Sequence, residues 1–263
     1  SGALDAEFLL RAFSGLSRGR LLAEPDALVA PSAAHAYGAA LARRAEHEPL
    51  QYILGKAAFW RDEFIVTPSV LIPRPETEIL VELTATRVRD VSAARILDVG
   101  TGSGCLGLSI LRELPSASLV ALDLSRDALL VAELNARALG LSDRTRFALS
   151  RWYDALAEGD TFDAIVSNPP YVAPSDRAML APQVRDFEPA LALFADERDD
   201  LSSYRALVDG VRDHLRPGGF VGFEVGVGQA DRVARLFEAS GFAALDVVSD
   251  LAGIPRVVAG RAR

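Results

Sequence analysis

The chain has 263 residues, half of them apolar, which is enough to bury the core of one large domain or of a catalytic domain with an appendage. Its net charge of −8 argues against a general nucleic-acid binder, because phosphate contacts favour a basic surface. One cysteine and three histidines are too few for a disulfide framework or a Cys/His zinc site, so we expect no metal. No apolar run is long enough to span a membrane, and no signal pattern is visible, so we expect a cytoplasmic protein.

Residues 1–56 predict a small helical domain. Leu4, Phe8 and Leu9 fall near helical spacing, and the helix of a following Ala-rich stretch must end before Pro49. This domain either packs only on itself or also binds a partner.

Residues 57–72 predict a β-hairpin or extended connector, because strand-forming residues are followed by punctuating prolines. Two prolines then hold the segment 72–78 extended, and a helix can begin at Pro75 or Thr77 with acidic residues in its first turn. Residues 73–263 form the expected catalytic domain.

Strand and helix patterns alternate from residue 94 onward, which predicts an α/β fold with a mostly parallel sheet and helices on both faces. The last two strands are joined by a short loop without a helix, so the final strand is expected to be antiparallel. A long loop follows residue 167, and Pro217-Gly218-Gly219 is expected to separate a helix from the next strand. The expected strands are 95–99, 119–122, 146–149, 164–167, 220–224, 243–249 and 255–259, and the expected helices are 104–113, 126–139, 201–215 and 229–239.

A glycine-rich turn, Gly100-Thr101-Gly102-Ser103-Gly104, joins the first of these strands to its helix. Glycines let the backbone approach a ligand closely, and a helix N-terminus offers free N–H groups. Gly102, Gly104 and Gly107 fit the dinucleotide pattern G-x-G-x-x-G, and Asp123 lies where it could hold ribose hydroxyls with either cofactor. Read from Gly100, the turn is the G-x-G-x-G turn seen in S-adenosylmethionine enzymes. The second phase begins directly after the strand and is favoured, although a purely structural turn stays open.

The segment Asn168-Pro169-Pro170-Tyr171 follows a buried strand beside the glycine turn. A planar nitrogen is a weak nucleophile and needs its N–H bonds held by acceptors. The Asn168 side-chain oxygen and the Pro169 carbonyl can accept these bonds, prolines stiffen the loop, and Tyr171 can stack on the planar group. The segment therefore predicts methyl transfer to an amide or amine nitrogen, with a Pro-rich structural turn as the alternative.

The whole chain resembles the HemK family of protein-(glutamine-N5) methyltransferases, which modify peptide-chain release factors. The resemblance implies a Rossmann-like seven-stranded methyltransferase sheet, preceded by a small N-terminal helical domain and a β-hairpin connector. It rests on residues 48–55, Phe59-Trp60, 71–78, 98–104, Asp123, Trp152, 167–171, Phe187-Glu188-Pro189 and 256–261.

The resemblance also implies the roles of individual residues. Gly100, Thr101, Gly102, Ser103 and Gly104 would wrap the methionine and ribose part of S-adenosylmethionine, Asp123 would bind the ribose hydroxyls, and Trp152 would flank the adenine. Asn168 would lie next to the methyl group. The catalytic residues would be Asn168, Pro169 and Tyr171. Together with Pro170 they would hold the glutamine of the Gly-Gly-Gln motif in a class I release factor. The N-terminal helical domain would help to bind that factor.

Some residues keep open roles. Arg151 stands where the family usually has an acid that accepts from the adenine amino group, so either the backbone or Asp154 would make this contact. Arg74 could orient substrate, anchor the connector or be solvated, and Glu224 could be structural or shape the substrate channel.

Two other activities share some of these sequence features. An adenine-N6 nucleic-acid methyltransferase shares the Asn-Pro-Pro-Tyr segment, but the chain has no obvious recognition insert and no basic balance. A nicotinamide-dependent oxidoreductase leaves this segment without a role. We therefore expect a monomer that acts on a release factor, without direct nucleic-acid or membrane binding.

Overall fold

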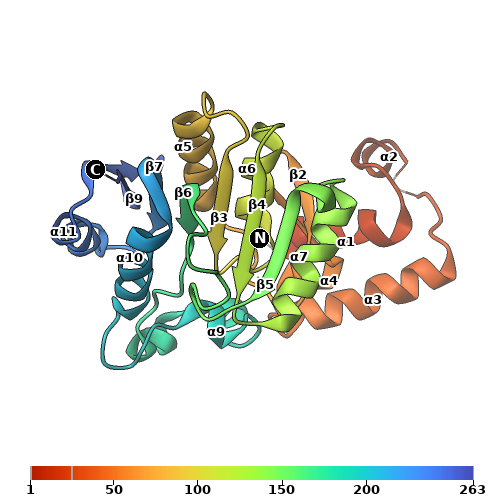
Figure 1. Ribbon diagram of the computed structural model, residues 1–263. Coiled ribbons are helices and arrows are strands. Elements are labelled where there is room, and N and C mark those ends of the chain that lie inside the picture. The colour runs from red at the N-terminus through yellow and green to blue at the C-terminus, as the bar shows by residue number, and fades with distance from the viewer. Residues whose placement is uncertain (1, 25, 263) are drawn as a thin grey trace.

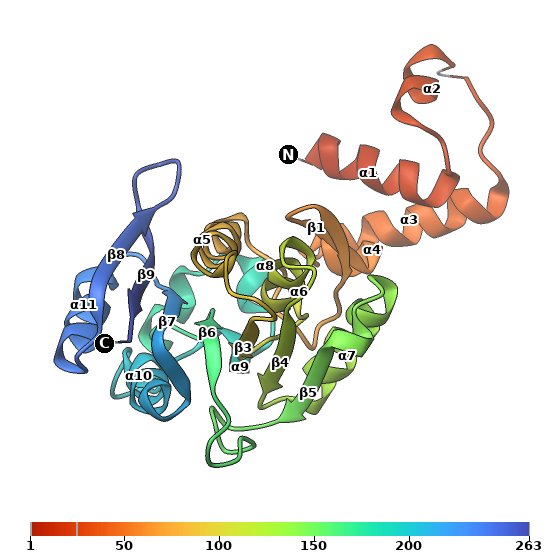
Figure 2. The ribbon, with the colours of Figure 1, turned by 45° about the horizontal axis from the view of Figure 1, so that its top comes forward.

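The N-terminal helices lie to one side of an α/β domain (Figures 1 and 2). The structure, a computed structural model, describes residues 2–24 and 26–262. Leu9, Ala40 and Ile53 are buried together in a small core of their own. The expected helical N-terminal region is confirmed, and its helices are α1 (Gly2–Ser14), α2 (Arg18–Ala23), α3 (Pro31–Ala45) and α4 (Leu50–Leu54).

A two-stranded hairpin connects this region to the large domain, as predicted. Strands β1 (Lys56–Phe59) and β2 (Asp62–Ile65) are antiparallel. Phe59 and Phe64 meet edge to face and are buried in the core of the large domain. The hairpin is therefore packed onto the catalytic domain rather than being a free linker.

The buried side chain of Asn135 fastens this hairpin to the glycine turn. Its Oδ1 accepts from the Ile65 N–H at 2.7 Å, and its Nδ2 donates to the Ile65 carbonyl at 3.0 Å and to the Ser103 carbonyl at 2.8 Å. One amide thus joins β2 and the glycine turn to the helix that carries Asn135, and both of its N–H donors and its oxygen take part.

The large domain is built on a seven-stranded sheet with the order β5-β4-β3-β6-β7-β9-β8. Strand β9 alone runs antiparallel to its neighbours, which confirms the expectation for the final strand. The chain order reverses between β3 and β6, and ligands of open parallel sheets bind at such switch points. The strands are β3 (Arg95–Val99), β4 (Ser118–Asp123), β5 (Thr145–Leu149), β6 (Phe162–Ser167), β7 (Leu215–Glu224), β8 (Ala243–Ser249) and β9 (Pro255–Arg261).

Helices cover both faces of the sheet (Figure 2). Ile96 packs with residues of α5 and α6, whereas its neighbour Leu97 packs with residues of α10 and α11, because successive side chains of a strand point to opposite faces. The helices of this domain are α5 (Glu78–Val88), α6 (Cys105–Glu113), α7 (Arg126–Ala138), α8 (Pro182–Arg185), α9 (Ala190–Leu193), α10 (Ser202–His214) and α11 (Ala230–Ala239), with short 3₁₀ turns at Pro75–Thr77, Ser142–Arg144 and Pro174–Met179.

Two local predictions were wrong. Pro217-Gly218-Gly219 does not separate α10 from the next strand but lies inside β7, which starts at Leu215. The register of the β6–β7 pair shifts there: Phe162 pairs with Leu215, but Ala164 pairs with Phe220. Strand β7 therefore carries extra residues at this point, and Pro217-Gly218-Gly219 lies in the resulting bulge. The long loop after β6 is also partly helical, with α8 and α9 in it, and its ends are bridged at Val172 and Phe194.

Candidate active site

The glycine turn is shaped by left-handed backbone and anchored by Asp123. Gly100, Gly102 and Gly104 have φ of 77°, 56° and 81°, a region in which a side chain is strained. The Gly102 N–H donates to Asp123 Oδ2 at 2.8 Å, and the Ser125 N–H donates to Asp123 Oδ1 at 2.8 Å. Burial raises the pKa of the Asp123 carboxyl, and these backbone bonds oppose the rise. The carboxylate thereby ties the end of β4 to the turn after β3.

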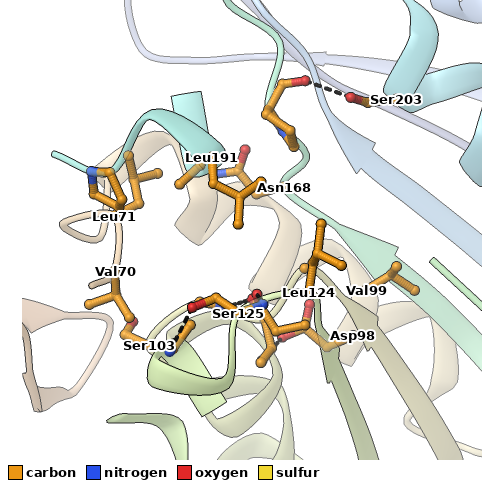
Figure 3. A pocket seen from close by; sticks show the side chains of 18 of the residues that line it. Val70, Leu71, Asp98, Val99, Ser103, Leu124, Ser125, Asn168, Leu191 and Ser203 are labelled. Carbon is orange, nitrogen blue, oxygen red and sulfur yellow. Dashed lines mark hydrogen bonds between the residues drawn. The ribbon is translucent and has the colours of Figure 1, made fainter. Parts of the chain in front are cut away.

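A cavity of about 820 Å³ opens at the carboxyl ends of β3, β4 and β6 (Figure 3). Its size lies within the usual range of small-molecule sites. Gly104, Pro169 and Tyr171 are not among its lining residues. The predicted site residues that line it are Gly100, Thr101, Gly102, Ser103, Asp123, Trp152, Asn168 and Pro170.

Asp98 also lines this cavity and was not among the predicted site residues. It is 1% exposed, and its Oδ2 accepts from the Thr101 hydroxyl at 2.7 Å and from the Gly107 N–H at 3.1 Å. Its Oδ1 has no hydrogen-bond partner among the described residues. Burial raises the pKa of Asp98 to about 7. A buried carboxylate with one free oxygen at a cavity suits a cationic ligand group. The signal for it was an acid at the penultimate position of the strand before the glycine turn.

Gly107 explains the overlap with the dinucleotide pattern. A Cβ at this position would lie 2.9 Å from Asp98 Oδ2 and 2.9 Å from a methyl carbon of Leu119. The glycine thus lets α6 pack closely against β3 and β4 and donate its N–H to Asp98. Close packing within the fold accounts for the third glycine without a pyrophosphate.

Hydrogen bonds from side chains elsewhere in the domain hold the Asn168-Pro169-Pro170-Tyr171 segment in place. The carbonyls of Pro170 and Tyr171 accept from the Ser203 hydroxyl at 2.8 Å and from Gln229 Nε2 at 3.1 Å. Within the described parts of the chain, no hydrogen bond uses the Pro169 carbonyl. An unused acceptor next to Asn168 is what the predicted substrate contact requires.

Tyr171 is turned away from the cavity. Its hydroxyl donates to Glu224 Oε1 at 3.4 Å, and its ring packs on the core formed with α10 and α11. Burial and the neighbouring Glu224 carboxylate raise its pKa above the ordinary range. Stacking of this ring on a substrate stays a prediction.

Trp152, which also lines the cavity, adopts a left-handed backbone conformation with φ of 51° and is partly buried. The Ser150 hydroxyl donates to the Trp152 carbonyl at 3.0 Å and stabilises this turn. Arg151 lines the cavity, whereas Asp154 does not. Which group accepts from the adenine amino group stays a prediction.

Arg74 joins the connector to the segment that follows the Asn-Pro-Pro-Tyr residues. Its guanidinium donates to Glu188 Oε1 at 2.6 Å, and Glu188 Oε2 accepts from the Ile72 N–H at 3.3 Å. The Glu188 side chain is buried, and Arg74 opposes the rise in its pKa that burial causes. Because Arg74 also lines the cavity, this ion pair holds one of its walls.

In residues 2–24 and 26–262, no group of three or more histidine, cysteine, aspartate or glutamate side chains is placed to hold a metal ion. None of the helices in the same ranges combines the length and apolar character that crossing a bilayer requires.

The fold and the family matches of two segments of the chain identify a methyltransferase. Residues 75–184 match the family described as Methyltransferase small domain, and residues 1–55 match the PrmC N-terminal domain. Among solved structures, the ribosomal protein L11 methylase of Lactobacillus delbrueckii subsp. bulgaricus superposes with a TM-score of 0.52 at 20% identity, covering 72% of this chain and 81% of that one. This likeness supports the predicted Rossmann-like methyltransferase fold.

Curated relatives narrow the class. The release factor glutamine methyltransferase of Cereibacter sphaeroides is 45% identical over 98% of this chain and 91% of its own length. That of Geobacter sulfurreducens is 41% identical over 98% of this chain and 89% of its own length. The chain belongs to the release factor glutamine methyltransferase family, as the resemblance indicated, and its cofactor is S-adenosylmethionine. The choice that the glycine turn left open is thereby decided against a nicotinamide cofactor.

Proposed function

We propose that the chain transfers a methyl group from S-adenosylmethionine to the side-chain amide nitrogen, N5, of the glutamine in the Gly-Gly-Gln motif of class I release factors. The observation that carries this proposal is the placement of Asn168 on the cavity wall beside the unused carbonyl of Pro169. The relatives, which are release factor glutamine methyltransferases, support the choice of substrate.

The protein's part in this reaction is positioning. When bound, S-adenosylmethionine supplies a methyl group that is electrophilic because it is attached to a sulfonium. The amide nitrogen of the substrate is a weak nucleophile, since its lone pair is delocalised into its carbonyl. Asn168 Oδ1 and the Pro169 carbonyl would each accept one of its N–H bonds and aim the nitrogen at the methyl carbon. As the N–C bond formed, the C–S electron pair would leave with the thioether sulfur of S-adenosylhomocysteine, and one N–H proton of the substrate would pass to solvent.

The residues around the cavity fit the cofactor in complementary ways. Gly100, Thr101, Gly102, Ser103 and Gly104 would form the backbone wall around its methionine and ribose part, and Asp123 would accept from the ribose hydroxyls. Trp152 would flank the adenine. The free oxygen of Asp98 would accept from the cationic amino group, which adds one residue to the predicted set.

We further propose that the partner is a class I release factor bound by a monomer in the cytoplasm, without direct nucleic-acid contact. The net charge of −8 supports a protein substrate over nucleic acid. Residues 1–56 would help to grip the factor, residues 57–72 would connect, and residues 73–263 would carry the chemistry.

Mass analysis of a purified class I release factor after incubation with enzyme and cofactor tests the proposal. We expect one added methyl group on the glutamine of Gly-Gly-Gln, and none when that glutamine is replaced by asparagine. Asn168→Ala should lower the turnover number about 100-fold or more, the usual effect of removing one oriented hydrogen-bond group. Full methylation of the asparagine factor, or methylation of an adenine oligonucleotide instead, would refute it.

A further inference from the structure

A buried hydrogen-bond chain lies directly behind Asn168. Asn168 Nδ2 donates to Thr77 Oγ1 at 3.2 Å, and Thr77 Oγ1 donates to Glu224 Oε2 at 2.5 Å. Thr77 and Glu224 are each 2% exposed. The three residues come from separate places: the loop after β6, the turn before α5 and the end of β7.

The direction of each hydrogen bond in this series follows from the Glu224 carboxylate at its end. An ionised carboxylate can only accept, so the Thr77 proton must point at Glu224. The Thr77 oxygen is then left to accept, and it accepts from the only donor of the Asn168 side chain, Nδ2. The Asn168 Oδ1 is consequently the free end of an amide that lines the cavity, where Figure 3 shows this side chain.

Shape alone does not fix this orientation. The nitrogen and oxygen of a side-chain amide have nearly the same size, so rotation by half a turn would fit the same space. In the rotated state Nδ2 would face the substrate and oppose a donor with a donor.

We propose that Glu224, acting through Thr77, is a positioning residue that sets which end of the Asn168 amide faces the substrate nitrogen. This inference rests on the proposed function, because it specifies how Asn168 comes to present an acceptor. It gives a role to two buried polar residues, of which Thr77 lines the cavity and Glu224 lies behind it.

The charge on Glu224 controls the chain. Burial raises the pKa of Glu224 to about 7, against the bonds from Thr77 and Tyr171. The other groups that face it are the Glu76 carboxylate, which raises this pKa, and the Arg256 guanidinium, which lowers it. The Cys105 thiol and the Tyr204 phenol also lie within its field.

Protonation of Glu224 can reverse the direction of both hydrogen bonds. A neutral Glu224 can donate to Thr77, which frees the Thr77 proton to donate to Asn168 Oδ1 in the rotated amide. Turnover at saturating cofactor and substrate should therefore fall as the pH drops through about 7.

Three variants test the proposal. Thr77→Val keeps the shape and removes the hydroxyl, and we expect its turnover number to fall about 10- to 100-fold. Thr77→Ser retains the hydroxyl and should recover most of this loss. Glu224→Gln cannot ionise and should lose the acidic limb of the pH profile. Thr84→Val is the matched control, since Thr84 is also buried but donates only to the Leu80 carbonyl of its own helix, and its turnover number should stay within twofold of wild type.

A second readout does not depend on turnover. In the wild-type protein labelled with ¹⁵N, the side-chain NH₂ signal of Asn168 should shift between pH 6 and pH 8, and it should not shift in Glu224→Gln. Cofactor affinity measured by calorimetry should be unchanged in Thr77→Val. Wild-type turnover by Thr77→Val, an acidic limb that persists in Glu224→Gln, or an Asn168 signal that is independent of pH would overturn the proposal. If wild-type enzyme leaves the release factor unmodified, the proposed function fails, whereas the NMR result still decides the hydrogen-bond chain.

Discussion

Replacement of Asp98 by asparagine removes a buried charge while preserving its shape. The amide oxygen can take the place of Oδ2 and accept from Thr101 and Gly107, whose bonds are 2.7 and 3.1 Å long. The amide nitrogen then takes the place of Oδ1, which has no partner among the described residues. The variant therefore separates the cost of the charge from the cost of the lost bonds.

The sign of the pH effect follows from the raised pKa. Since burial raises the pKa of Asp98 to about 7, the native state binds a proton that the unfolded state releases between about pH 4 and pH 7. The free energy of unfolding of the wild-type protein therefore falls as the pH rises through this window. Above it, the full cost of the buried charge lowers the stability. At about 1.4 kcal/mol per tenfold change in acidity the penalty is at most about 4 kcal/mol, and relaxation around the charge makes about 1–3 kcal/mol the expected effect.

Urea unfolding at several pH values without ligand measures this effect. The stability of Asp98→Asn relative to wild type should grow from pH 4 to pH 7 and level off above. Affinity for S-adenosylhomocysteine, which keeps the amino group, should fall about 10- to 100-fold because an amide nitrogen replaces the accepting oxygen. The exposed Asp209→Asn is the control and should show neither change. A stability difference that is independent of pH, together with unchanged affinity, would refute the reasoning.

Two further predictions concern the contacts that hold the site together. Asn135→Ala should lower the free energy of unfolding by about 3–5 kcal/mol in urea, because it leaves buried backbone groups of Ile65 and Ser103 unpaired; a loss below about 1 kcal/mol would contradict this role. Arg74→Ala should destabilise the protein more at pH 8 than at pH 5, because the buried Glu188 carboxylate loses its partner and gains a proton only at the lower pH. Equal losses at both pH values would count against the ion pair.

The sequence predicted where the reaction occurs but not the contacts that hold the site together. The residues that line the cavity from the glycine turn lie within a few positions of one another, and Asn168 follows a strand that the hydrophobic pattern identifies. Such signals are local, and they place side chains at the same edge once the strands are parallel. Thr77 and Glu224 are 147 residues apart, and no local pattern pairs them.

Other residues were missed or misread because their contacts are distant in the sequence. Nothing in the sequence around Asn135 marks it as different from a polar residue on a helix surface, yet the structure buries it against the hairpin and the glycine turn. Pro217-Gly218-Gly219 has the composition of a helix stop, but pairing with β6 draws these residues into β7 as a bulge.

The sequence by itself determined the fold class, through its alternating strand and helix patterns, and its glycine turn and proline-rich segment predicted where a ligand binds, because glycine and proline restrict the backbone wherever they stand. Only the tertiary structure decided which polar groups are satisfied and which are left free. The unused oxygen of Asp98 and the bond from Asn168 to Thr77 exist because several strand ends converge on one cavity. Burial at this cavity raises the pKa of the Asp98 carboxyl, and in the same buried surroundings we propose that one hydrogen bond orients the Asn168 amide.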